Sequence, residues 1–422
     1  MADLDMQTET VRRIYEAWKT EGDKEPARRY LGASIVGNPC DMALFLEFRG
    51  VVRESFSGRM YRLFNRGQRE EATFVKELRS IGCEVWEVDP DTGAQWEVKA
   101  LGGHFSGHLD GVCLGVPEAP KTPHVTEFKT HSDASFRKLQ KSGVRVAKPN
   151  HYAQMMVYMG AMRLTRALYL AVDKDNDELY SERIEFSKPE YDAIMLRAKR
   201  IIETSNPERL AGRPDDFRCR FCPAHAVCWH TTGTVLSHQG VLDCRTCCHS
   251  TARTDIDGAR WECRLGRPCA IGHAANCPDH LALPALVDAD GIEDANLGHV
   301  TYRIGKQLCT NGKANGQFSS EELQRIGRVA IESGAIQAIK DVIPTAKVSA
   351  CTDRYARYLE TKPVFEGDEE QFQHWREQNP SCLTTVGSMS VGGVEYHEFE
   401  DGVLWEHDAG RGVWRVYMTC PF

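Results

Sequence analysis

The 422-residue sequence has no long apolar segment. No run approaches the ~20 apolar residues that a membrane-spanning helix requires. The N-terminal stretch MADLDMQTETVRRIYEAW is charged and amphipathic, and it has no apolar core of the kind found in signal peptides. We therefore expect a cytoplasmic protein without a membrane partner.

The sequence also lacks an excess of positive charge. Its 52 lysines and arginines are outnumbered by 60 aspartates and glutamates, which gives a formal net charge of −8. This balance argues against a surface coated in positive charge for non-specific nucleic-acid binding, although a local basic channel is still compatible with it. A candidate channel, with a solvated loop as the alternative, is the basic run Lys129, Arg137, Lys138, Lys141, Arg145 and Lys148.

Cysteine, in contrast, is abundant. The chain has 16 cysteines, and nine of them lie between Cys219 and Cys277, several in C-x2-C pairs. In a reducing cytosol this pattern indicates metal binding rather than disulfides.

The length allows two or three domains. Residues 1–235 have a mixed α/β pattern, residues 240–286 form a short Cys/His-rich module, and residues 290–422 are predicted to be an α+β region of unknown role. In this last region the capping-box pair Ser319 and Glu322 predicts the start of a pair of helices.

Hydrophobic spacing predicts the elements of the first domain. Helices are expected at 8–30, 67–83, 148–164 and 188–205, and strands at 83–88, 106–116 and 124–130, with two more within 166–186. A helix is also expected to start at DMALFLEF, directly after Cys40.

The candidate catalytic and metal-binding residues lie around the stretch TEFKT. Glu127 and Lys129 are two residues apart on a predicted strand, so both side chains point to the same face. Asp110 lies in GHLDG at the end of the preceding predicted strand. Two carboxylates at neighbouring strand ends can hold a cation such as Mg²⁺, and a lysine beside them can orient a water or stabilise charge on a phosphate.

Three more polar residues accompany this group. Gln154 and Tyr158 are four residues apart on a predicted helix and therefore share a face, and Glu71 can add a third carboxylate. Taken separately, the Glu-x-Lys pair is compatible with a surface ion pair and the Gln/Tyr pair with coincidence. Their order along the chain, however, favours a common site.

That order, over about residues 30–230, resembles the PD-(D/E)xK nuclease superfamily and specifically its RecB-like branch. The resemblance implies a restriction-endonuclease-like core, a mixed sheet flanked by helices. It implies that Asp110 and Glu127 bind Mg²⁺ or Mn²⁺ and that Lys129 is the catalytic lysine. Gln154 and Tyr158 would shape the DNA-binding side of the site, and Glu71 would lie on a supporting helix.

One position departs from this family pattern. Many RecB-like nucleases have a metal-binding histidine shortly before the helix glutamate, whereas Gln68 stands at the best-matching position here. His104 and His108 are candidates to compensate. The departure bears on how many metal ions bind and how active the site is.

The motif FRCRFCPAHAVC places Cys219, Cys222 and Cys228 at C-x2-C-x5-C spacing. A subset of RecB-like nucleases, including AddB-type and CRISPR-adaptation nucleases, has this spacing after the nuclease motifs and one cysteine before them. The resemblance implies that Cys40 is the fourth ligand of a [4Fe–4S] cluster that closes the two ends of the nuclease fold. The alternative is zinc on the same thiolates, or on three of them with His225 or His230.

A second set of cysteines lies in the 240–286 module. Cys244 and Cys247 form a C-x2-C knuckle, which with Cys263 and Cys277 suits a four-ligand zinc site. Alternative ligands are His280, Cys269, Cys248 and His249, and unligated cysteines in a loop are a further alternative. The module is compatible with DNA contact, partner contact or a stabilising role.

The sequence is thus interpreted as a metal-dependent DNA nuclease, and family resemblance favours an exonuclease acting on DNA ends or single strands in recombination, repair or replication. A looser resemblance connects the arrangement with nuclease-like bacteriophage proteins. The alternative is a nuclease-derived DNA- or protein-binding protein that cuts weakly or not at all, which Gln68 and the acidic net charge favour. Expected partners are DNA, a recombination or replication protein and, by resemblance, further copies of the chain.

Overall fold

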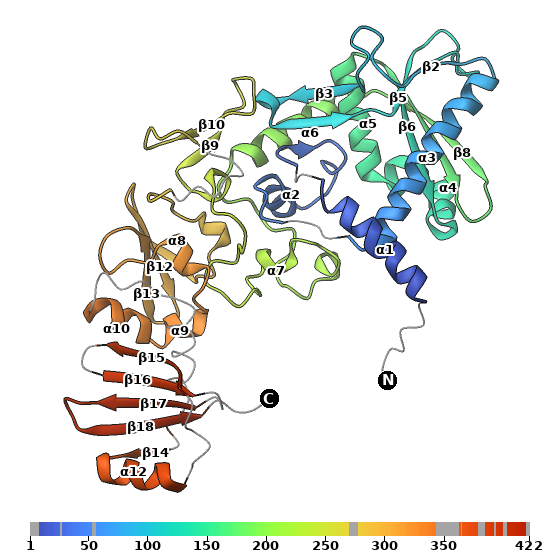
Figure 1. Cartoon of the computed structure of the whole chain (residues 1–422). Coiled ribbons are helices and arrows are strands. Elements are labelled where there is room, and N and C mark those ends of the chain that lie inside the picture. The colour runs from blue at the N-terminus through green and yellow to red at the C-terminus, as the bar shows by residue number, and fades with distance from the viewer. Residues whose placement is uncertain are drawn as a thin grey trace. The chain divides into compact units, whose positions relative to one another are not determined.

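A computed structural model describes residues 8–25, 28–52, 56–269, 277–342, 363, 365–378, 385–391, 394–399 and 403–418. The chain divides into two compact units (Figure 1). The first comprises Met1–Ala224 with Thr251–Glu262, and the second comprises His225–Ser250 with Cys263–Phe422.

The first unit is built on a five-stranded mixed sheet of order β2-β5-β6-β7-β8. Its strands are β2 (Glu84–Trp86), β5 (Gly111–Leu114), β6 (His124–His131), β7 (Arg166–Asp173) and β8 (Leu179–Glu185). β6 and β7 are parallel, and the other neighbours are antiparallel. Helices flank the sheet, so the predicted mixed α/β class is confirmed for the described residues.

A second sheet of the first unit has the order β1-β4-β3, with β1 (Leu31–Gly32), β4 (Phe105–His108) and β3 (Glu97–Ala100). The single strand predicted at 106–116 is therefore wrong. The chain pairs with β3 up to His108, passes through Leu109 and Asp110, and then pairs with β2 and β6 as β5. This crossing between sheets places Asp110 at a bend instead of a strand end. The 3₁₀ turn η1 (Leu101–Gly103) joins β3 to β4.

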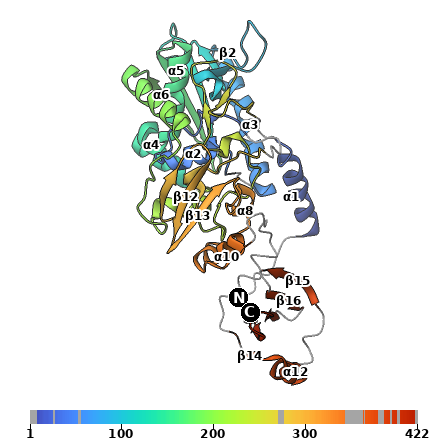
Figure 2. The ribbon, with the colours of Figure 1, turned by 90° about the vertical axis from the view of Figure 1, so that its left-hand side faces the viewer.

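The helices of the first unit are α1 (Glu9–Gly22), α2 (Asp41–Phe48), α3 (Gly58–Ser80), α4 (Asp133–Ala147), α5 (Pro149–Met162) and α6 (Lys188–Glu203). α5 and α6 lie side by side in both ribbon views (Figure 1, Figure 2). α3 starts earlier than the predicted 67–83 because the Ser57 hydroxyl caps it by accepting from the backbone N of Met60.

α4 covers most of the basic run, so the solvated-loop alternative is wrong for this segment. Phe136 and Leu139 are buried three residues apart with Arg137 and Lys138 between them, and the buried Val144 follows a kink at the non-helical Gly143. Part of this charge is neutralised, since Arg137 pairs with Asp133 and Arg145 with Glu190.

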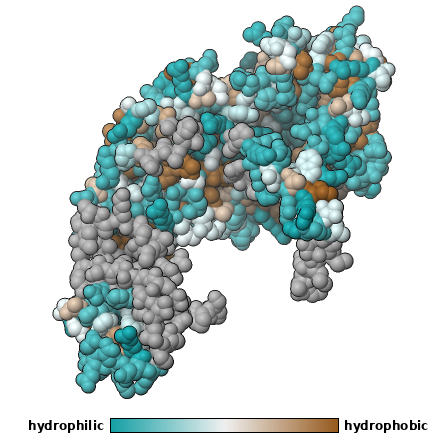
Figure 3. All heavy atoms as spheres, viewed as in Figure 1, coloured by the Kyte–Doolittle hydropathy of each residue, from teal (hydrophilic) through white to brown (hydrophobic). Residues whose placement is uncertain are grey.

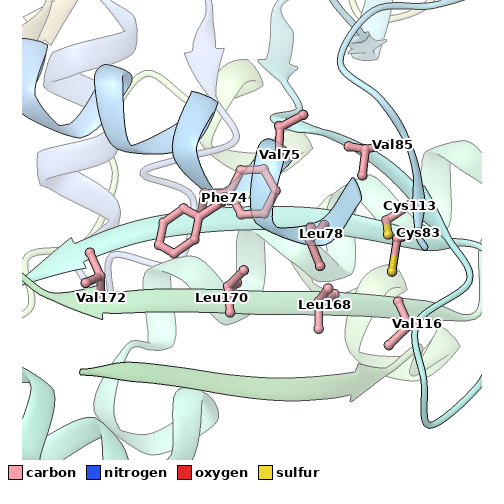
Figure 4. Packing of buried hydrophobic residues seen from close by; sticks show 11 residues of the cluster. Phe74, Val75, Leu78, Cys83, Val85, Cys113, Val116, Leu168, Leu170 and Val172 are labelled. Atoms are coloured by element: carbon pink, nitrogen blue, oxygen red, sulfur yellow. The ribbon is translucent and has the colours of Figure 1, made fainter. Parts of the chain in front are cut away.

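α3 packs its apolar side chains against one face of the central sheet (Figure 4). The Phe74 ring stacks on Phe128 of β6 with 5.2 Å between ring centroids. The remaining members of this core come from α3, the sheet strands and their links: Val75, Leu78, Cys83, Val85, Cys113, Val116, Leu168, Leu170 and Val172. The other face of the sheet carries Glu127 and Lys129 of β6 beside buried residues of β7 such as Tyr169 and Ala171.

The second unit begins with short elements, namely α7 (His225–Cys228), η3 (Cys244–Thr246) and η4 (Pro284–Leu286). The 3₁₀ turn η2 (Phe217–Cys219) precedes them in the first unit, and the hairpin of β9 (Ser250–Ala252) and β10 (Trp261–Cys263) spans the boundary between the units. A three-stranded antiparallel sheet follows, made of β11 (Gly291–Ala295), β12 (His299–Ile304) and β13 (Gln307–Gly312).

Three short helices, α8 (Ser320–Leu323), α9 (Arg328–Glu332) and α10 (Ala335–Val342), stand where a pair was predicted. The predicted capping box is confirmed, because the Ser319 and Glu322 side chains each accept from the other's backbone N–H. The last sheet has the order β14-β18-β17-β16-β15 and is accompanied by α12 (Glu369–Gln378). Its strands are β14 (Phe365–Gly367), β15 (Thr385–Val391), β16 (Val394–Phe399), β17 (Val403–Asp408) and β18 (Val413–Met418).

Within the ranges that the structure describes, none of the helices combines the length and the hydrophobicity needed to cross a membrane. The described surface in Figure 3 is largely hydrophilic, with small scattered hydrophobic areas.

The packing of α3 on the sheet gives a first testable prediction. Leu78 is 6% exposed in the core, whereas Leu196 on α6 is 71% exposed. We expect Leu78→Ala to lower the free energy of unfolding by about 2–5 kcal/mol, because it removes buried methyl groups and leaves a cavity. The matched control Leu196→Ala should change it by less than about 0.5 kcal/mol. Urea unfolding followed by circular dichroism measures both, and equal effects would contradict this account of the core.

Candidate active site

The candidate site is built on the polar face of β6. Side chains alternate along this strand, so Phe128 enters the apolar core while Glu127 and Lys129 face the opposite side. α5 packs over this side of the sheet. The two residues predicted to share a face therefore lie on the face away from the hydrophobic cluster.

Asp110 joins them from the bend between β4 and β5. Its Oδ2 accepts a hydrogen bond from the backbone N of Phe128 at 2.7 Å, which fixes the carboxylate against β6. Lys129 Nζ lies 2.5 Å from Glu127 Oε1 and 3.9 Å from Asp110 Oδ2. The two carboxylates thus converge on one positive charge.

Glu127 is fully buried, and neither of its carboxylate oxygens has a hydrogen-bond partner of good geometry among the described residues. Burial raises the pKa of Glu127 to about 7, Lys129 opposes this rise, and Asp110 adds to it. For Lys129, burial alone would lower the pKa, but Glu127 and Asp110 outweigh burial and hold it above its ordinary value. The pair is therefore held together by charge in a poorly solvated place.

Glu71 lies on α3 within electrostatic reach of this group. Burial raises the pKa of Glu71 to about 7, the nearby Asp110 adds to the rise, and Lys129 opposes it. A carboxyl that responds to both residues belongs to the same cluster of charge. The structure therefore brings together Glu71, Asp110, Glu127 and Lys129.

Gln154 and Tyr158 hold the bend that carries Asp110. Gln154 Nε2 donates to Tyr158 Oη at 3.1 Å, and Tyr158 Oη donates to the backbone O of His108 at 2.7 Å. A Cβ atom on Gly107 would lie 2.8 Å from Tyr158 Oη, so the close approach requires glycine there. These two residues position the backbone shortly before Asp110, a role that sequence spacing alone does not reveal.

The histidines considered as substitutes at Gln68 lie elsewhere. Gln68 itself is exposed on α3. His104 is buried against Phe48 and Trp261, and its Nε2 lies 2.9 Å from the backbone O of Arg260. The His108 side chain faces Glu97, with 3.9 Å between His108 Nε2 and Glu97 Oε1. The contacts described for both imidazoles are thus with groups outside the carboxylate cluster.

Three residues next to the cluster escaped the sequence analysis. Tyr169 on β7 is the register partner of Glu127 and is fully buried. Its Oη lies 2.9 Å from His131 Nε2 and 2.9 Å from His151 Nδ1. The available signals were weak: His131 continues the alternation of Glu127 and Lys129, and His151 stands three residues before Gln154.

The carboxylates suit a hard divalent cation. Across the described ranges, no three His, Cys, Asp or Glu side chains are already grouped as a metal site. The fit rests instead on two observations: the Lys129 ammonium takes the place of a cation between Asp110 and Glu127, and apart from Lys129 the described residues place no hydrogen-bond donor on the Glu127 oxygens. Carboxylate oxygens are the ligands that Mg²⁺ and Mn²⁺ prefer.

Cys40 is the N-cap of α2, and its Sγ accepts from the backbone N of Ala43. The turn is attached to α6 by Asp41, which pairs with Arg197 at 2.7 Å and Arg200 at 2.6 Å. The backbone N of Met42 also donates to the O of Glu208, in the segment that leads to Cys219.

Cys219 ends η2, and the backbone N of Cys222 donates to the O of Cys219. Cys228 is buried at the end of α7, in the second unit. The structure thus places the Cys40 turn beside the chain that precedes Cys219, and a cluster with Cys228 as a further ligand stays a prediction.

Cys247 is the most deeply buried of the predicted zinc ligands. Burial raises the pKa of its thiol to about 11, the backbone N–H groups of His249 and Leu281 oppose the rise, and nearby Cys277 and Cys263 add to it. The last two contributions place Cys263 and Cys277 within electrostatic reach of Cys247. Cys244 opens η3 on the other side of the knuckle.

His280, one of the alternative zinc ligands, has both ring nitrogens within hydrogen-bonding distance of hydroxyl groups. Nδ1 lies 2.9 Å from Ser320 Oγ, and Nε2 lies 3.1 Å from Thr246 Oγ1. A ring engaged at both nitrogens has none left for a metal. The contacts of His280 therefore favour a structural role and leave the cysteines as the better ligands.

The buried pair predicts a pH dependence. Because the folded-state pKa of Glu127 is raised, the folded protein takes up a proton on acidification before the unfolded chain does, and this stabilises the fold. In the presence of a chelator, Lys129→Met should destabilise by about 3 kcal/mol near pH 8 and by less near pH 5.5, where Glu127 is protonated. Thermal melting at both pH values, with the double variant Lys129→Met, Glu127→Gln as control, measures the effect. An equal loss at both values would contradict the burial of an unpaired carboxylate.

No family model matches this chain, and no curated protein matches it either. Among solved structures, the chain is similar to SSO0001 with 13% identity and a TM-score of 0.33, over 53% of this chain and 97% of that one. It is similar to LHK-Exo in complex with dAMP, with 15% identity and a TM-score of 0.30, over 45% and 90%. It is also similar to the alkaline exonuclease LHK-Exo from Laribacter hongkongensis, with 18% identity and a TM-score of 0.29, over 44% and 90%. These likenesses are weak, and the function proposed for the chain depends on the geometry of its site.

Proposed function

We propose that the protein is a metal-dependent DNA nuclease that hydrolyses phosphodiester bonds. The observation that carries this proposal is the convergence of Asp110 and the buried Glu127 on the Lys129 ammonium. A carboxylate is costly to bury even when it is paired, and buried carboxylates with a raised pKa are often found where their charge is used. Phosphodiester hydrolysis uses such a group, because carboxylates can hold the metal cation that stabilises the negative charge on the attacked phosphate in the transition state.

Each residue of the site has a separate task. Asp110 and Glu127, with Glu71 beside them, would hold Mg²⁺ or Mn²⁺, which supplies Lewis acidity and an activated water. Lys129 would then be released from the carboxylates to donate hydrogen bonds to the attacking water or to a phosphate oxygen. Gln154 and Tyr158 keep the bend in place by their bonds to each other and to the backbone of His108. An exonuclease acting on DNA ends or single strands, in recombination, repair or replication, is the form of this activity that the family resemblance favours.

Two structural metal centres are part of the proposal. Cys40, Cys219, Cys222 and Cys228 would bind a [4Fe–4S] cluster, and Cys244, Cys247, Cys263 and Cys277 would bind zinc. The bonds from the α2 turn to α6 and to Glu208 support a stabilising role for the first, because they already join segments far apart in sequence. The nearness of Cys263 and Cys277 to Cys247 supports a shared ligand set in the second.

The second candidate function is a nuclease-derived protein that binds DNA or a partner without efficient cleavage. It is favoured by the exposed Gln68 in place of a metal-binding histidine and by the net charge of −8. In either case DNA is the proposed ligand. A recombination or replication protein and further copies of the chain are proposed partners.

The nuclease proposal is tested with end-labelled single- and double-stranded DNA. We expect degradation that requires Mg²⁺ or Mn²⁺, and a loss of about 100-fold or more in Asp110→Ala and in Lys129→Ala, because the first removes a proposed metal ligand and the second a positive charge beside the reacting phosphate. Gel analysis of the products measures the rate and shows the polarity. Asp192→Ala and Lys199→Ala on α6 are matched controls and should leave the rate nearly unchanged, because both side chains are largely exposed and lie outside the basic run.

Binding of DNA without metal-dependent cleavage, by protein that carries its full metal content, would contradict the nuclease proposal and favour the second function. Equal losses in the α6 controls would show that the effect reflects charge in general and not the site.

The metal centres predict the composition of the purified protein. Anaerobically purified protein should be brown and contain both iron and zinc, measured by elemental analysis and visible absorption. Cys222→Ala should lose iron and keep zinc, whereas Cys247→Ala should lose zinc and keep iron, because the ligand sets do not overlap. Cys113→Ala, a buried core cysteine, is the control that should keep both metals. Zinc alone in wild-type protein would contradict the [4Fe–4S] cluster.

A further inference from the structure

We propose that His151, Tyr169 and His131 form a proton relay that delivers a proton to the leaving oxygen of the cleaved phosphodiester. This inference rests on the proposed nuclease function and assigns that site a general acid.

The three residues adjoin the candidate active site. His131 follows Glu127 and Lys129 on the same face of β6, and Tyr169 is the β7 neighbour of Glu127. His151 lies three residues before Gln154 on α5 and therefore shares its face. The two imidazole rings stack with 6.1 Å between centroids, and each also stacks near Tyr169.

The three groups are coupled because the Tyr169 hydroxyl has to hydrogen-bond with both imidazoles. Tyr169 Oη lies 2.9 Å from one nitrogen of each imidazole, but the hydroxyl has a single hydrogen. It donates to one ring and must accept from the other, so one facing nitrogen carries a proton and the other does not. Rotating the hydroxyl reverses both tautomers. The chain of three groups can therefore pass a proton from one end to the other.

Both rings are held in the neutral form. Burial lowers the pKa of His131 to about 4, with Lys148 and Lys129 adding to the effect. Burial lowers the pKa of His151 to about 3, with Lys129, His131 and Lys148 adding to it. An isolated buried imidazole would be a poor proton source under these conditions. A relay avoids the imidazolium, because every ring that gives a proton receives another.

The proposed step balances as follows. Water attacks phosphorus, its oxygen forms the new P–O bond, and its surplus proton passes to solvent. The bond from phosphorus to the leaving oxygen breaks, and that oxygen takes the proton of His151 Nε2. His151 Nδ1 takes the proton of Tyr169 Oη, which takes the proton of His131 Nε2. His131 Nδ1 then takes a proton from solvent, and all three groups end neutral.

Half-buried His151 is suited to face the substrate. Nδ1 is the nitrogen bonded to Tyr169, so Nε2 points away from the relay. His131 is 7% exposed and lies at the other end, where exchange with solvent has to occur. His151 is therefore the proposed catalytic residue, and Tyr169 and His131 are positioning residues that act through it.

The test uses single-turnover cleavage of ordinary DNA and of DNA with one bridging phosphorothiolate, with sulfur in the 3′ or the 5′ position. A departing thiolate needs no proton, so it separates proton delivery from positioning. Tyr169→Phe removes the central hydroxyl, and His151→Asn keeps an atom near Nδ1 but lacks Nε2. Tyr152→Phe is the matched control, because Tyr152 also lies on α5 but donates to Glu190. Thermal melting verifies that each variant is folded. His151→Gln, which retains a donor near the position of Nε2, is the second variant at this residue.

We expect Tyr169→Phe and His151→Asn to cleave ordinary DNA about 100-fold more slowly than wild type, and Tyr152→Phe to stay within about threefold. On the phosphorothiolate in which sulfur is the leaving atom, every variant should have a cleavage rate within about threefold of the wild-type rate. Equal losses on both substrates would overturn the relay and indicate positioning alone, and so would the absence of any loss. A wild-type protein that cleaves neither substrate would overturn the proposed function together with the relay.

Discussion

The Glu127 carboxylate has no exposed surface, and the arrangement around it is determined by the need to compensate its charge. Lys129 supplies the opposite charge from the same strand, and Asp110 is directed to the same place by its bond to the backbone of Phe128. The bend between β4 and β5 must then be kept in position, and Tyr158 does so through the carbonyl of His108. These contacts compensate the charge of the Glu127 carboxylate, which is buried away from water.

The parts of this site that sequence predicts are those set by short-range periodicity. Alternation on a strand puts Glu127 and Lys129 on one face, and a four-residue spacing puts Gln154 and Tyr158 on one face of a helix. The capping box at Ser319 is equally local, and it is present. Such patterns depend on backbone geometry that each segment has by itself.

What sequence did not predict depends on partners distant in the chain. The segment 106–116 reads as one strand, yet it changes sheets at Asp110 because β3 and β2 offer separate pairing edges. α4 was hidden by its many basic residues, and its kink at the non-helical Gly143 is fixed by Glu182 of β8, whose Oε2 accepts from the backbone N of Val144. Tyr169 gains its importance from the register of β6 with β7, which brings its hydroxyl between two histidines. None of these pairings is encoded in a local pattern.

The division of β6 into an apolar face and a charged face has a consequence for the evolution of such proteins. Phe128 and its neighbours hold the strand in the core, while Glu127 and Lys129 add charge that the fold itself does not need. Replacement of a buried ion pair by apolar residues is often neutral or stabilising, by roughly 1–4 kcal/mol. Random substitution therefore has an easy route from catalyst to inert scaffold, with the architecture intact. Wherever the charged face of this strand persists in a lineage, its persistence is a record of selection for chemistry and not for stability.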